Sequence, residues 1–190
     1  MNRELSIILR DAIKDLPFVG KVSGLVKTIE QNRPTENDKY VTLRFPASLD
    51  PLTPLAPGQY ADMSPDSAFK SVFFVEAQSS RVRGRNSRGG IEMSSTLRLI
   101  GWLNSGFQAG AEALAIAHVL KAIPEHPINL EFIKNITITL GVVLGVEDRI
   151  FGRYTLPEEK RQFLMSPFTA FAIDFTFEFT ISIHCLPEYE

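Results

Sequence analysis

The segment Phe171–Cys185 alternates along its whole length between two kinds of residue. Its odd positions are Phe or Ile until Cys185 ends the series, and its even positions are mostly polar or charged. Successive side chains of a β-strand point to opposite faces of a sheet, so eight consecutive repeats of this period predict a long, two-faced strand. A strand of this length either bends or pairs in part outside its own domain. We therefore expect a fold organised around a β-sheet.

The remaining periodicities supply partners for that strand. Three- and four-residue apolar spacings predict amphipathic helices, and alternation predicts strands. The helices are expected at Glu4–Leu16 and Ala109–Ile123, with a short helical piece near Pro157–Leu164. The strands are expected from Val19 to Ile29 and at Tyr40–Phe45, Ser71–Ser80, Ile91–Leu103 and Ile136–Val146, and Gln31–Lys39 is expected to be a turn or loop. This order predicts an α+β fold, with a mostly antiparallel β-sheet and two main helices packed on one face. A chain of 190 residues suits a single domain spanning 1–190.

Residues 46–68 differ in kind because they contain five prolines. That density predicts an irregular segment, and an irregular loop of about 20 residues is uncommon inside a compact domain. Two interpretations stay open: an arm that lies along a neighbouring subunit, or a surface loop packed on its own domain. Under the first, the candidate subunit-contact residues are Pro51, Pro54, Pro57 and Tyr60.

Residues 81–90 are expected to form an Arg- and Gly-rich hairpin tip. The arginines are Arg81, Arg83, Arg85 and Arg88, and on an extended hairpin the first three would point to one side. Guanidinium groups recognise phosphate or carboxylate, so the tip is a candidate contact with nucleic acid or with an acidic patch on a partner. A solvated tip is the alternative. The net charge of −2 argues against a protein coated by nucleic acid over its whole surface.

Catalytic and metal-binding patterns are missing from the sequence. The single cysteine, Cys185, allows no disulfide within the chain and no Cys-x-x-Cys zinc site. His184 adjoins it, but neighbours in a strand point to opposite faces and form no nucleophile–base pair. Asp174 and Glu178 would lie ~13 Å apart along one strand face, too far for a carboxylate pair. We expect the chain to have no catalytic residues, no metal, no cofactor and no membrane span. We also expect it to be made and used, or assembled, in a reducing cytoplasm.

The order of elements resembles the tail-terminator, or tail-completion, proteins of tailed bacteriophages. The resemblance rests on the opening helix, the alternating strand around Thr96–Leu103, the helix Ala109–Ile123 and the closing β pair. It implies a structural protein without catalytic residues that forms a ring, usually of six copies, between the tail tube and the head-side connector. It also implies a location in the virion after assembly in the host cytoplasm, with DNA as a candidate occupant of the lumen.

The Pro-rich segment and the arginine tip are additions, since this chain is longer than usual members of that family. A neck, connector or tube-related ring protein would have a similar pattern. Two other functions compete with the ring. One is a nucleic-acid-binding module acting through Arg81–Arg88, and the other is an enzyme or ligand carrier with a pocket between the sheet and the helices.

Overall fold

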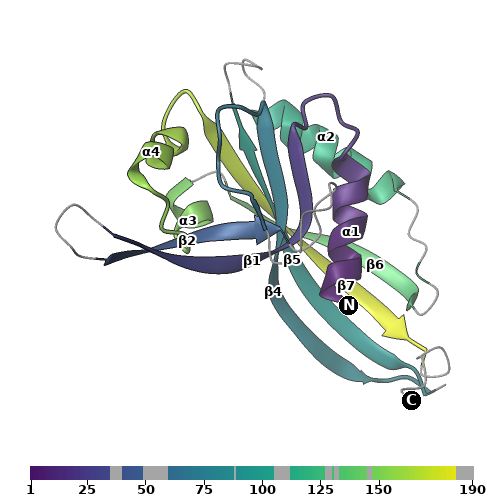
Figure 1. The fold of residues 1–190 in the computed structure, drawn as a ribbon. Coiled ribbons are helices and arrows are strands. Elements are labelled where there is room, and N and C mark those ends of the chain that lie inside the picture. The colour runs from purple at the N-terminus through teal and green to yellow at the C-terminus, as the bar shows by residue number, and fades with distance from the viewer. Residues whose placement is uncertain are drawn as a thin grey trace.

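A seven-stranded sheet in the order β3-β2-β1-β4-β5-β7-β6 forms the centre of the computed structural model (Figure 1). The structure describes residues 1–34, 40–48, 60–87, 89–104, 112–126, 130, 133–144 and 147–182. All the strand pairs are antiparallel except β1–β4, which is parallel. The fold is therefore α+β with a mostly antiparallel sheet, as predicted. Its elements are α1 Asn2–Ile13, β1 Lys21–Pro34, β2 Tyr40–Ser48, β3 Ala61–Asp62, β4 Ser71–Arg85, β5 Ile91–Leu103, α2 Glu112–Glu125, β6 Ile133–Leu144, α3 Glu147–Phe151, α4 Glu158–Arg161, the 3-10 turn η1 Gln162–Leu164 and β7 Thr169–Ile181.

The helices α1 and α2 cover one face of the sheet (Figure 1). Their apolar stripes and the odd-numbered residues of β5 and β7 share one buried cluster. Burial of these side chains is the main driving force for this layer. This arrangement confirms the prediction of two main helices on one face. The most buried members include Leu5, Leu9, Ile13, Phe73, Leu97, Leu99, Val119, Ile123, Phe171, Ile173 and Phe177.

A second, smaller apolar layer covers part of the opposite face. It is supplied by α3, by Tyr154 and Leu156 after it and by η1, and it packs on Trp102, Phe74 and Ala172. The indole Nε1 of Trp102 donates a hydrogen bond of 2.6 Å to the carbonyl of Phe163, which ties the layer to β5. The sequence predicted only a short helical piece near Pro157–Leu164 and did not reveal this layer. Helices of four or five residues are too short to show an apolar period.

The strand β7 has the predicted two faces, and it pairs with β5 from Thr169 to Ile181. Its other side pairs with β6. The described part of the strand therefore finds its partners within the chain. The odd-numbered residues are buried beneath the helices, whereas the even-numbered residues from Asp174 to Thr180 are partly exposed. The last predicted positions, His184 and Cys185, lie outside the described residues.

The two strands β1 and β2 form a hairpin that projects from the body of the molecule (Figure 1). The prediction that Gln31–Lys39 is a loop was wrong for its first part, since β1 continues to Pro34, which lies opposite Tyr40. Both faces of the outer hairpin are mostly exposed and carry polar residues. The sequence there therefore lacks the alternation of apolar and polar residues that predicts a strand.

The prediction of no regular structure in 46–68 was also wrong at both ends. Strand β2 runs through Pro46 to Ser48, and β3 pairs with it. The Pro46 carbonyl accepts a hydrogen bond of 2.8 Å from Met63 N, so this residue turns its main-chain polar groups away from β1. The missing proline N–H therefore removes no bond from the β1–β2 ladder. Residues 49–59, which contain Pro51, Pro54 and Pro57, lie outside the described part.

The helix α2 and the strand β6 differ from their predicted bounds. The described helix continues past Pro124 to Glu125, while the predicted start at Ala109 lies outside the described residues. Strand β6 begins earlier than predicted, at Ile133, and its register shifts between Leu140 and Val143. That shift breaks the single apolar face expected for Ile136–Val146.

Candidate functional site

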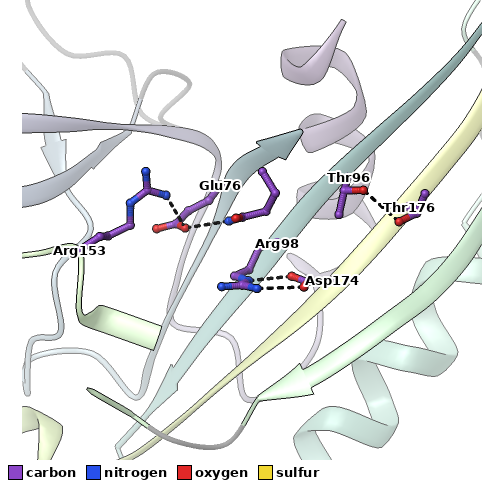
Figure 2. Close-up of polar contacts among 7 residues, drawn as sticks. Glu76, Thr96, Arg98, Arg153, Asp174 and Thr176 are labelled. Carbon is purple, nitrogen blue, oxygen red and sulfur yellow. Dashed lines mark hydrogen bonds and ion pairs between the residues drawn. The ribbon is translucent and has the colours of Figure 1, made fainter. Parts of the chain in front are cut away.

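A row of charged side chains crosses the face of the sheet opposite α1 and α2. Glu76, Arg98 and Asp174 lie side by side on β4, β5 and β7 (Figure 2). Arg98 donates from Nε and Nη2 to the two Asp174 oxygens, at 2.7 and 2.9 Å. A paired guanidinium and carboxylate of this kind has strong geometric specificity. In the next row, the Thr96 and Thr176 hydroxyls are 3.1 Å apart, so polar pairing continues along the strands.

Glu76 is the buried anchor of this row, with 3% of its surface exposed. Its carboxylate accepts hydrogen bonds from Tyr154 OH, from Arg153 Nη1 at 2.8 Å and from Gln78 Nε2 at 3.2 Å. Figure 2 shows Arg153 reaching Glu76 from outside the sheet. Since Arg153 and Tyr154 follow α3 directly, these bonds fasten the second layer to β4.

The electrostatics of the row favour the charged forms of Arg98 and Arg153 and the neutral form of Tyr154. Burial, together with the neighbouring Glu76 charge, raises the pKa of the Tyr154 phenol above its ordinary value. Hydrogen bonding to Asp174 raises the pKa of Arg98. Burial by itself lowers the pKa of Arg153, but the hydrogen bond and charge of Glu76 outweigh it, and the net shift is upward. Each carboxylate is thus engaged by a cation, an arrangement that suits a rigid scaffold better than proton transfer.

A second polar cluster joins β3 to α4 around Asp62. Its carboxylate accepts hydrogen bonds from Lys160 Nζ at 2.7 Å and from Ser64 N at 2.8 Å. Lys21 Nζ donates to the Asp62 carbonyl at 2.6 Å. Burial opposes the charge on Asp62, but the bonds from Lys160 and Ser64 outweigh it, so the pKa of Asp62 is lowered.

This lowered pKa predicts an acid-sensitive contribution to stability. The contribution is fully present above the pKa of Asp in the unfolded chain, ~3.9, and is lost as the pH falls through the lower pKa of the folded state. Urea denaturation between pH 6 and pH 2.5 measures it. The Asp62→Asn variant is expected to lose stability at pH 6 and to show a flatter acid limb than the wild type. A wild-type acid limb in the variant would contradict this role for Asp62.

The sequence predicted that the arginine side chains of the hairpin point to one side, and the structure contradicts this prediction. Arg81 lies opposite Ser94 and Arg85 opposite Ile91, on different faces of β5, because the register shifts between Val82 and Gly84. Arg83 forms an ion pair with Glu178 of β7. Strand β4 also runs on to Arg85, so the connecting turn is shorter than 81–90. Arg88 lies outside the described residues. Of the other predicted contact residues, Tyr60 is described and is exposed.

An apolar groove that the sequence did not reveal lies between α2 and β6, the last strand of the sheet. Its volume is about 410 Å³, and its lining is Leu120, Ile123, Pro124, Ile136, Ile138, Leu140 and Phe175. Leu140 is 48% exposed and Val143 on the same strand is 42% exposed. One sign of this surface is visible in the sequence, because Val143 is apolar in the otherwise Thr and Gly series of alternate residues Thr137, Thr139, Gly141, Val143 and Gly145.

Another open cavity, of about 420 Å³, lies in the second layer, with Phe151, Leu156, Arg161 and Met165 among its lining residues. Neither it nor the apolar groove includes the charged row. Among the described residues, no group of three or more His, Cys, Asp or Glu side chains is placed to hold a metal ion. No helix in the described part of the chain has the length and apolar character needed to cross a membrane.

The charged row, the Asp62 cluster and the apolar groove are thus the three candidate sites of the described chain. Two of them join elements of the fold to one another, and the third is a partly exposed apolar surface. Comparison of the chain with protein-family models, with curated proteins and with solved structures gives no match.

Proposed function

We propose that this chain is a structural virion protein of a tailed bacteriophage that forms a ring at the head–tail junction. Its place there is that of a tail terminator or of a neck or connector component. Its partners are further copies of itself, the tail tube and the head-side connector.

The arrangement of elements supports this proposal. The opening helix α1 and the later helix α2 pack on the same face of the sheet, and β6 and β7 close it beside β5. The element order is the one on which the resemblance to tail-terminator proteins rests. Such a likeness is one of fold and element order, so function must be argued from surfaces.

The observation that carries the proposal is the exposure of large apolar side chains toward both ends of the sheet. Tyr40 and Val41 are exposed on the β1–β2 hairpin, and Leu140 and Val143 are exposed on β6. Uncovered apolar surface on a sheet edge is typical of a contact with another chain. Two different surfaces at opposite ends favour head-to-tail association, which closes into a ring when the rotation between copies is suitable.

The internal ion pairs also suit a structural role. The Arg98–Asp174 pair and the bonds to Glu76 tie strands and layers together and leave these carboxylates occupied. The arginine hairpin fits the alternative of a nucleic-acid-binding module less well. Arg83 is already paired with Glu178, and Arg81 and Arg85 face opposite ways.

Native mass spectrometry and negative-stain microscopy test this function, with the chain alone and mixed with the tail-tube protein encoded nearest to it. We expect a closed ring of identical subunits, and portal, capsid or tail-tube genes beside its own gene. A protein that stays monomeric at high concentration, both alone and with the tube protein, would argue against the proposal. Salt-sensitive DNA binding that weakens in an Arg81→Ala/Arg85→Ala variant, without ring formation, would favour the nucleic-acid module instead.

A further inference from the structure

We infer that the open cavity of the second layer binds a small carboxylic acid in its ionised form, with the carboxylate at Arg161 and the apolar body against the cavity wall. The cavity has a volume of about 420 Å³, and α3, α4 and η1 each contribute to its lining. None of its lining residues belongs to the Asp62 cluster or to the α2–β6 groove. Mostly apolar cavities of ~300–1,000 Å³ with a few polar groups are typical sites for small molecules. The inference does not depend on the ring proposal, because it uses none of the surfaces that carry that proposal.

The wall of the cavity is apolar and is held in place by the fold. Phe151 and Leu156 line it and are only 3% and 4% exposed, so most of each side chain is packed within the second layer. The ring of Tyr154 lies beside that of Phe151, with centroids 6.4 Å apart, and Glu76 accepts a hydrogen bond from its hydroxyl. A wall that is already ordered can bind the hydrocarbon part of a ligand without a cost for rearrangement.

The outer part of the cavity exposes apolar surface that a ligand can cover. Met165 lines the cavity and is 66% exposed, and the half-buried Leu164 precedes it. Methionine is unbranched and polarisable, so its side chain adapts to aliphatic and aromatic groups. Covering this side chain removes apolar surface from water, which favours a ligand with a hydrocarbon body.

The polar side chains of the lining are those of Tyr154, Thr155 and Arg161. The Tyr154 hydroxyl is already bonded to Glu76. The Thr155 hydroxyl and the Arg161 guanidinium have no hydrogen-bond partner among the residues that the structure describes. Two donors therefore remain for a ligand, and both suit an acceptor such as a carboxylate oxygen.

Arg161 is the one charged residue in this lining, and no described carboxylate forms an ion pair with it. Glu159 on the same helix is instead paired with Arg33, at 3.8 Å. An unpaired guanidinium can bind a carboxylate through two parallel hydrogen bonds. Glu158 and Glu159 are both exposed on α4, and their charges disfavour a dianion such as a phosphate monoester. A ligand with a single negative charge therefore fits best.

Methyl NMR spectroscopy with 13C-labelled methionine tests this site. Of the four methionines in the chain, Met165 lines the cavity, whereas Met93 packs against the main core and serves as an internal reference. The probes are octanoate, octan-1-ol and octyl phosphate, which share one apolar chain and differ in charge. The variant is Arg161→Gln. The matched control is Arg149→Gln, which removes the same charge from an exposed position on α3 outside the lining.

We expect octanoate to shift the Met165 methyl resonance in a saturable way, with a dissociation constant of about 0.1–1 mM, and to leave the Met93 resonance unmoved. Arg161→Gln should weaken octanoate binding by about five- to tenfold, because it removes a charge-assisted bond at a partly exposed site. Octan-1-ol should bind the wild type and this variant equally, and more weakly than octanoate binds the wild type. The Arg149→Gln control should bind octanoate like the wild type.

Other results would overturn the inference. A Met165 resonance without a saturable shift up to about 20 mM octanoate would exclude a ligand site in this cavity. Equal octanoate binding by the wild type and Arg161→Gln, or an equal loss in Arg161→Gln and Arg149→Gln, would exclude Arg161 as the partner of the carboxylate. Tighter binding of octyl phosphate than of octanoate would refute the preference for a single negative charge.

Discussion

Replacing Glu76 with alanine is expected to lower the free energy of unfolding by about 2–4 kcal/mol. The change leaves the buried Tyr154 hydroxyl and the Arg153 guanidinium without their shared acceptor. Removing one member of a fully buried pair costs ~3–5 kcal/mol, but Arg153 is half exposed and regains water, which reduces the loss. Urea denaturation at pH 7 measures the change, and loosening of the second layer should appear as faster hydrogen exchange in residues 147–164.

The matched control is Glu178→Ala, which removes a carboxylate from the same sheet face. Its ion pair with Arg83 is solvent-exposed on both sides, so the expected loss is within about 1 kcal/mol. Equal losses in the two variants would contradict the assignment of Glu76 as the anchor of the second layer.

Replacing Phe171 with alanine is expected to destabilise the fold by about 3–5 kcal/mol. Its ring is fully buried, and it meets the ring of Phe73 edge to face with centroids 5.9 Å apart. The same ring fills the space above Gly101, where an added Cβ would approach Phe171 Cζ to 2.8 Å. Chemical denaturation measures the loss, and the slope against urea should stay unchanged if only the native core is affected.

The control for this core substitution is Met165→Ala, because Met165 is 66% exposed in the second layer. Its expected effect lies within about 0.5 kcal/mol. A loss at Phe171 no larger than the loss at Met165 would show that the helix face of β7 does not form the main core.

The part of the fold that could be predicted is the part in which burial follows a regular period. The alternation in β7 and the helical stripes of α1 and α2 persist over enough residues to reveal which side is buried. The second layer could not be found in this way. Its helices are short, and its attachment to the sheet depends on single residues such as Glu76 and Trp102, whose partners are far away in the chain.

The candidate surfaces were predicted less well than the sheet. The arginine hairpin was identified, but one register shift in β4 places Arg85 on the other face from Arg81. The apolar groove could not be predicted, because the alternating pattern places Leu140 among the other apolar residues of its strand and does not show that it is left uncovered. Whether an apolar residue in a strand is covered depends on what packs above it, and at this end of β6 the helix α2 leaves a groove.

The sequence by itself determined the sheet, the two faces of β7, the opening and second helices, and hence an α+β fold. These follow from local periodicity, since the spacing of apolar side chains dictates which backbone conformation can bury them together. Only the tertiary structure decided the strand order, the pairing of Glu76 with Arg153, the direction of each arginine and the position of the α2–β6 groove. These depend on contacts between segments distant in the chain, in which a shift of one residue changes the face on which a side chain lies.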